Sequence, residues 1–179
     1  PTPIPPIETA SALLLPPNEA FVMAEEDALD FPNGVIFKGI QWKLHSASIP
    51  RPAPGAGVGH HFESQLDFQL SLGGGRGMYQ PARAPATVDV VITRLGSIDS
   101  GLFEVEVTGC AAWGGDLPGG IMLRESPILP SRGMLNAVPL ASGPWQVDSF
   151  FDVFFELSTD GGLSWLQSPG RPLHLDLQS

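Results

Sequence analysis

Cysteine is almost absent from this sequence, since Cys110 is the only one among 179 residues. An intrachain disulfide is therefore excluded, and a single domain of this length has to be stabilised by its hydrophobic core. Cys110 has small or apolar neighbours, in Val-Thr-Gly-Cys-Ala-Ala. This setting predicts a buried hydrophobic side chain rather than a reactive thiol.

Positive charge is also scarce. The sequence has 9 lysines and arginines against 19 aspartates and glutamates, which gives a formal net charge of −10. A surface of this sign repels nucleic acid phosphates and anionic lipids. Apolar runs long enough for a transmembrane helix are missing as well. Nucleic-acid binding and membrane insertion are therefore not expected.

Stretches that favour helix are few, whereas glycine and proline together make up more than a fifth of the residues. Both residue types favour turns and extended segments. From residue 34 onward apolar and polar residues alternate, which is typical of strands with one buried face. The expected strands are residues 35–44, 61–72, 87–95, 102–109, 119–124, 145–157 and 173–177.

The predicted fold class is all-β. About eight strands without a βαβ rhythm favour an antiparallel β-sandwich, with an antiparallel β-barrel as the alternative. Residues 73–86, rich in glycine and then proline, are expected to connect two strands. In the strand 145–157, Phe150 and Phe154 lie opposite the main apolar face. That second face is expected either to be partly covered or to present the two rings to a partner.

Residues 1–33 are interpreted as an extended N-terminal arm before a β domain of residues 34–179. Prolines fix φ and remove amide donors, so the arm should be extended. Within it, residues 18–29 predict a short helix, with Asn18 as the cap and Glu19 in the first turn. The apolar side chains of the arm would favour a groove on the same domain or on a neighbouring subunit. These side chains are Ile4, Ile7, Leu13, Leu14 and Leu15.

One short motif has a recognisable pattern, Ser-Thr-Asp-Gly-Gly-Leu-Ser-Trp at residues 158–165. It resembles the Asp-box hairpin, which is repeated in sialidase-like propellers and occurs singly in other β domains. A short acidic side chain can accept backbone amides in such a turn, and the tryptophan is expected to pack against the base of the hairpin. The resemblance implies a structural turn without a catalytic role. The matching residues are Ser158, Asp160, Gly162, Ser164 and Trp165.

Two longer segments lie in the last third of the chain. They read Ile-Met-Leu-Arg-Glu-Ser-Pro-Ile-Leu-Pro-Ser-Arg-Gly from residue 121 and Val-Asp-Ser-Phe-Phe-Asp-Val-Phe-Phe-Glu-Leu-Ser-Thr-Asp-Gly-Gly from residue 147. They resemble uncharacterised secreted bacterial β proteins, some of which carry a PEP-CTERM-type sorting tail. The resemblance implies a bacterial protein that is secreted or held at the cell surface, and it implies no activity.

Signatures of common catalytic and cofactor sites are absent. The sequence has no Gly-x-Ser-x-Gly elbow, His-Glu-x-x-His pair, phosphate loop or Cys-x-x-Cys. His60 and His61 are adjacent, so on a strand they face opposite sides and cannot easily bind one metal ion together with His45 or His174. We therefore expect no catalytic residue, no cofactor and no metal site.

Two pairs of carboxylates lie on expected outward faces, Glu104 with Glu106, which are two residues apart, and Asp148 with Asp152, which are four residues apart. The strand rise separates Glu104 from Glu106 by about 7 Å, a spacing found in inverting glycoside hydrolases. Such pairs are common on an acidic β domain, and no other feature of the sequence indicates a cleft.

Three functions follow from these patterns. The first is a non-catalytic structural or cell-surface protein that self-assembles through its arm into a filament or coat, as a homo-oligomer. The second is a carbohydrate-binding module for a surface glycan, with Trp42, Trp113 or Trp145 as the stacking ring. Trp113, between two alanines and two glycines, is the favoured ring. The third is a glycoside hydrolase that uses paired carboxylates.

Overall fold

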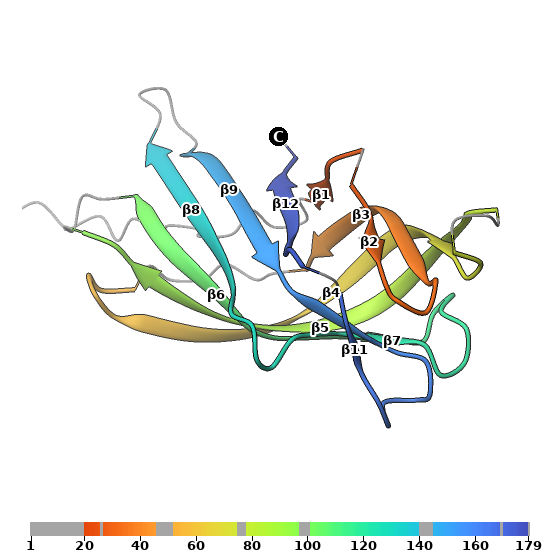
Figure 1. Cartoon of the computed structure of the whole chain (residues 1–179). Coiled ribbons are helices and arrows are strands. Elements are labelled where there is room, and N and C mark those ends of the chain that lie inside the picture. The colour runs from red at the N-terminus through yellow and green to blue at the C-terminus, as the bar shows by residue number, and fades with distance from the viewer. Residues whose placement is uncertain are drawn as a thin grey trace, which may run out of the picture.

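The computed structural model describes residues 20–25, 27–45, 52–74, 78–96, 101–139, 145–168 and 170–178. Within these residues every regular element is a β-strand (Figure 1). The all-β prediction is confirmed. The apolar arm residues, from Ile4 to Leu15, lie outside the described residues.

Eight antiparallel strands form a closed barrel. Of the two architectures predicted from the sequence, the chain therefore adopts the alternative, the antiparallel β-barrel. Around the wall the order is β6-β5-β4-β3-β1-β12-β9-β8, and β8 pairs back onto β6. Sandwiches and barrels bury alternate residues in the same way, so alternation alone does not separate them. The barrel strands are β1 (Ala20–Met23), β3 (Ile36–Leu44), β4 (Gly57–Ser71), β5 (Gln80–Arg94), β6 (Leu102–Trp113), β8 (Ser131–Pro139), β9 (Trp145–Val153) and β12 (Leu173–Leu177).

The segment predicted as a helix contributes two strands instead. β1 pairs with both β3 and β12, and β2 (Leu29–Asp30) pairs with β3. The helix predicted for residues 18–29 is therefore wrong at these strands, and the sheet begins before residue 34. Phe21 and Met23 alternate into the core, where they are 1% and 5% exposed. The pairing of β1 with β3 and β12 outweighs the local preference for a helix capped by Asn18.

β5 is longer than predicted, because residues 80–86 belong to the strand rather than to a connection. Pro81 and Pro85 lie opposite β4 in the antiparallel register. β6 pairs with β5 only from Ala86 onward. The two prolines therefore lie where one edge of β5 has no β6 ladder, which is a position that tolerates a missing amide donor.

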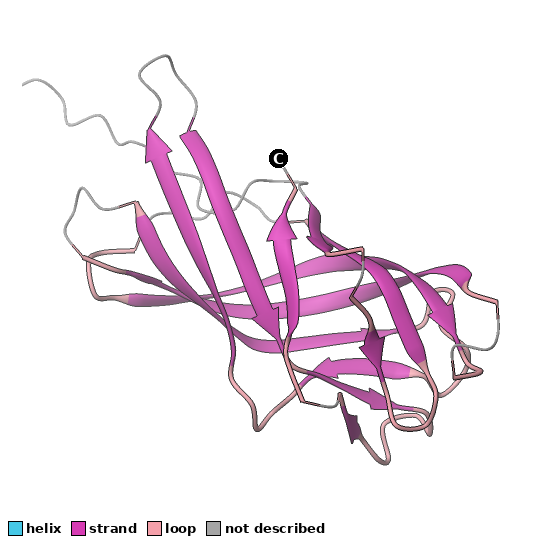
Figure 2. Cartoon of the chain, turned by 45° about the horizontal axis from the view of Figure 1, so that its top comes forward, coloured by secondary structure: helices cyan, strands magenta, loops and turns pink. Residues whose placement is uncertain are grey.

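A small flap of three strands extends from the second half of β6 (Figure 2). β7 (Met122–Glu125) pairs with β6, β10 (Phe155–Ser158) pairs with β7, and β11 (Leu166–Gln167) pairs with β10. β6 thus has two partners on the same side, β8 along its first half and β7 along its second. Residues 126–130 connect these partners, and Phe154 separates β9 from β10.

Aromatic rings fill the core of the barrel. The ring centroids of Phe21 and Phe151 are 4.5 Å apart, and the Trp42 ring lies 6.2 Å from Phe151 and 6.5 Å from Phe155. Trp42 is 1% exposed, and its Nε1 donates to Ser64 Oγ over 2.9 Å. Trp42 is therefore a core residue, and the alternative that placed it on a glycan surface is wrong.

Cys110 is buried, as its neighbours in the sequence predict. Burial raises the pKa of its thiol to about 12, and the charges of Glu125 and Asp89 add to the rise. A thiol with such a pKa stays protonated at neutral pH, so Cys110 is chemically inert in the folded protein.

Candidate functional site

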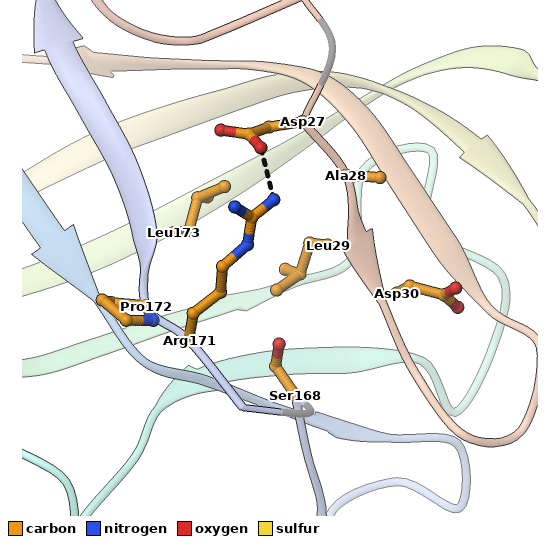
Figure 3. Close-up of a pocket in the computed structure, with 8 residues that line it drawn as sticks. All are labelled: Asp27, Ala28, Leu29, Asp30, Ser168, Arg171, Pro172 and Leu173. Atoms are coloured by element: carbon orange, nitrogen blue, oxygen red, sulfur yellow. Dashed lines mark hydrogen bonds and ion pairs between the residues drawn. The ribbon is translucent and has the colours of Figure 1, made fainter.

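A small hollow lies between residues 27–30 on one side and Ser168 with residues 171–173 on the other (Figure 3). Its volume is about 60 Å³, which is room for a couple of water molecules. The Arg171 side chain reaches across it, and Arg171 Nη2 lies 2.5 Å from Asp27 Oδ1. This hollow is too small for an organic ligand, and its arginine is already paired with an aspartate.

A larger hollow lies beside Trp113, the ring that the sequence favoured as a stacking platform. Its volume is about 230 Å³. Trp113 is the last residue of β6 and is 48% exposed. The ring is accessible, as a stacking platform requires. The lining residues come from β4, β5 and β6, and they are Glu63, Ser64, Pro85, Ala86, Thr87 and Trp113.

The register of the strands explains why the surface is hollowed there. Glu63 lies opposite Thr87, and Thr87 lies opposite Ala111. These residues alternate with buried ones, so they belong to the outer face of the sheet. Among the lining residues, Pro85, Ala86 and Thr87 have short side chains, whereas Glu63 and Trp113 have long ones. The hollow therefore has a floor of short side chains, a carboxylate at its wall and an indole ring beside it.

A second large hollow, of about 280 Å³, lies where β7 and β8 separate along β6. Glu106 and Glu125 line it together with residues 126–130. The loop is fixed by Ser126, whose hydroxyl donates to Glu156 Oε1 over 3.1 Å. The Ser126 amide donates to the carbonyl oxygen of Phe154 over 2.7 Å.

Glu125 is the unusual carboxyl group of this second hollow. Burial raises its pKa, a hydrogen bond to Ser131 opposes the rise, and the neighbouring charges of Glu156 and Glu106 add to it. A carboxyl group with a raised pKa has the property of a general acid. The sequence does not indicate Glu125, because its proximity to Glu106 depends on how β7 and β8 share β6.

The carboxylate pairs expected from the sequence do not form a cleft. Glu104 Oε1 lies 3.7 Å from Arg132 Nη1, and Asp152 Oδ1 lies 2.7 Å from His174 Nδ1. Of the four predicted carboxylates, Glu106 lines a hollow described above, and its neighbour there is Glu125 rather than Glu104.

The Asp-box-like turn is held by a compact network of hydrogen bonds. Ser158 Oγ donates to Asp160 Oδ1 over 2.8 Å and accepts the Gly162 amide over 2.8 Å. Asp160 in turn accepts the amide and the hydroxyl of Ser164. Hydrogen bonds from Ser164, and then from Ser158, lower the pKa of Asp160 to about 2. Gly161 and Gly162 have φ values of 75° and 91°, which a side chain would disfavour.

Trp165 packs against the neighbouring strand of the flap. Its ring lies 4.0 Å from the Arg124 guanidinium carbon, and its Nε1 donates to the Gly162 carbonyl over 3.1 Å. The same guanidinium donates from Nε and Nη2 to Glu156 Oε2, over 2.9 and 2.6 Å. The turn thus ties β10 to β7, and the residues of its motif line neither of the large hollows.

Phe150 and Phe154, the expected partner face, are both partly buried. The Phe150 ring lies 5.3 Å from the His174 ring. Phe154 falls at the break between β9 and β10, where its amide donates to Ser131 Oγ over 3.1 Å. Both residues are thus partly covered, and they do not form a fully exposed aromatic pair.

His174 predicts a pH-dependent contribution to stability. Its hydrogen bond to Asp152 raises its pKa, desolvation opposes the rise, and the charge of Asp176 adds to it. The stabilisation is therefore full below about pH 6.5, and it is lost as the pH rises through the folded-state pKa. We expect His174→Gln to lower the free energy of unfolding by about 0.5 kcal/mol at about pH 5.5 and by less at about pH 8.5. Urea unfolding measures both values.

The control for this prediction is the Asp152→Asn background. There His174→Gln should have a smaller effect, with a weaker dependence on pH, because the main hydrogen-bond acceptor has lost its charge. An equal loss at both pH values in the native background would contradict a contribution from the charged imidazole.

Metal-ligating side chains do not gather into a site within the described ranges, where no group of three or more His, Cys, Asp and Glu is placed to hold an ion. His61 instead pairs with Asp89 over 2.7 Å. Among the residues that the structure covers, no helix has the length and apolarity needed to span a membrane.

Comparison of the chain with protein-family models, with curated proteins and with solved structures gives no match. The candidate site therefore rests on the geometry of the barrel itself.

Proposed function

We propose that this barrel is a non-catalytic, secreted or cell-surface protein that binds a saccharide in the hollow beside Trp113. One observation carries the proposal. An indole ring that is 48% exposed stands beside a hollow of about 230 Å³ that also contains a carboxylate and a hydroxyl. Trp42 and Trp165 are more buried than Trp113, and the side chain of Trp145, the third predicted stacking ring, lies outside the described side chains.

These groups match the two faces of a sugar. The C–H face of a pyranose is apolar and packs on an aromatic ring, whereas its hydroxyls need polar partners. Trp113 supplies the ring. Glu63 supplies a charged acceptor and Thr87 a hydroxyl, from the two strands before it. A few placed polar groups around an apolar contact are typical of a binding site for a small polar ligand.

Self-assembly through the N-terminal arm stays a prediction, since residues 1–17 lie outside the described residues. Saccharide binding is a separate proposal, because the lining residues of the hollow come from β4, β5 and β6.

The test is a glycan array followed by calorimetry of the bound oligosaccharides. We expect the native protein to bind at least one saccharide, and Trp113→Ala to weaken that binding at least tenfold, or about 1.4 kcal/mol. Val138→Ala is the matched control, because Val138 is 47% exposed on β8, away from the hollow. Its affinity should stay within about twofold of the native value.

Two outcomes would contradict the proposal. One is the absence of binding above background, and the other is equal binding by Trp113→Ala and the native protein.

Hydrolysis is a second candidate function, favoured by the raised pKa of Glu125 beside Glu106 in the second hollow. The same incubations test it. If reducing ends accumulate with the native protein and disappear with Glu125→Gln, the protein is a hydrolase and the non-catalytic proposal is wrong.

A further inference from the structure

We propose that the Trp113 hollow selects uncharged saccharides and rejects uronates and other acidic sugars, with Glu63 as the residue that sets this specificity. The inference rests on the proposed saccharide binding and names the class of saccharide. It follows from the charge of the residues that line the hollow and from the ion pairs of the basic residues around it.

No basic side chain lines the hollow among the described residues, whereas the Glu63 carboxylate does. Glu63 is exposed, and no ion pair joins it to another residue in the part of the chain that the structure describes. An acidic sugar entering the hollow would therefore meet a negative charge. The net charge of −10 on the whole chain adds a repulsive background.

Lys43, Arg83 and Arg124, on the neighbouring outer rows of the sheet, are held in ion pairs and do not line the hollow. Lys43 Nζ lies 2.5 Å from Asp67 Oδ2, and Arg83 Nε lies 3.2 Å from Asp67 Oδ1. On the other side, Arg124 is bound by Glu156 and covered by the Trp165 ring. Lys43 and Arg83 share the one carboxylate of Asp67, but neither of them lines the hollow, whereas Glu63 does.

Glu63 favours a neutral sugar for a further reason. A carboxylate is an acceptor only, and sugar hydroxyls are donors, so the two form charge-assisted hydrogen bonds. An ionised uronate presents acceptors of the same sign in the same position. The hollow thus has a group that both attracts hydroxyls and repels acids.

The experiment compares neutral tetramers of glucose, galactose and mannose with the tetramer of the uronate of each sugar. Calorimetry is done with the native protein, Glu63→Gln and Trp113→Ala, at low salt and at about 0.5 M salt. Asp148→Asn is the matched control, because it makes the same change of charge at an exposed position on β9, outside the hollow.

For the native protein we expect at least one neutral tetramer to bind, and its uronate to bind about tenfold more weakly at low salt and less so at high salt. Glu63→Gln should weaken the neutral tetramer a few-fold and reduce the uronate penalty to about threefold or less. Asp148→Asn should leave the ratio of the two affinities unchanged.

The inference is overturned if uronates bind the native protein as tightly as neutral tetramers, or if Glu63→Gln changes the ratio no more than Asp148→Asn does. Both results leave saccharide binding itself intact as long as Trp113→Ala weakens it at least tenfold. If none of the tetramers binds, neutral or acidic, the proposed function fails for these sugars and the inference fails with it.

Discussion

Gly133→Ala is expected to destabilise the barrel by about 3 kcal/mol, at the upper end of what an added methyl group costs in a packed core. Gly133 is buried in β8, opposite Phe151 of β9. A Cβ atom there would overlap the Phe150 carbonyl oxygen and the Phe151 ring. β8 is bonded to β6 on one side and to β9 on the other, so it cannot move away from either without opening the closed wall.

Urea unfolding followed by far-ultraviolet circular dichroism measures this cost. The matched control is Gly59→Ala on β4, where an added Cβ meets no atom within 4 Å. Its free energy of unfolding should stay within about 1 kcal/mol of the native value. If Gly133→Ala does not fold while Gly59→Ala does, the destabilisation is larger than expected and the prediction stands. If the two variants are equally stable, β8 relaxes freely around the added methyl group and the prediction is wrong.

The strands were largely predictable from the sequence, because alternation is a local property. Phe151, Val153, Phe155 and Leu157 share a buried face in both the prediction and the structure. The closure of the barrel was not predictable, since it depends on β6 pairing with β8 across a register that no local pattern encodes. The helix expected near Asn18 failed for the same reason, because tertiary pairing decided the conformation of residues 20–23.

In the candidate site too, some residues are indicated by the local sequence and others only by the pairing of the strands. Trp113 could be identified from its position between two alanines and two glycines, although it was expected in a loop and lies at the end of β6. Glu63 and Thr87 could not, because they reach the hollow through the register of β4 with β5 and β6. Glu125 was missed because its neighbours Glu106 and Glu156 come from strands that are distant in the sequence. Residue types can suggest one member of a site, whereas its partners depend on strand order.

Arg124→Ala is expected to destabilise the protein by about 3 kcal/mol, because it leaves a buried carboxylate without its counter-ion. The Glu156 side chain is 4% exposed, and Arg124 binds it through two nitrogen atoms. Ser126 donates another hydrogen bond to Glu156, but a neutral hydroxyl stabilises a buried carboxylate less than a charged guanidinium does. The substitution also removes the cation that the Trp165 ring covers, so the Asp-box-like turn should loosen with it.

A double-mutant cycle separates the buried charge from the lost packing. Adding Glu156→Gln to Arg124→Ala should recover part of the stability, about 1 kcal/mol or more, because an amide in that position costs less to bury than a carboxylate. The surface control is Arg132→Ala, which breaks the Glu104 pair at 3.7 Å between side chains that are 61% and 41% exposed. That change should cost about 0.5 kcal/mol or less. If Arg124→Ala costs no more than Arg132→Ala, the Glu156 carboxylate is adequately satisfied by Ser126 and solvent, and the flap does not depend on the ion pair.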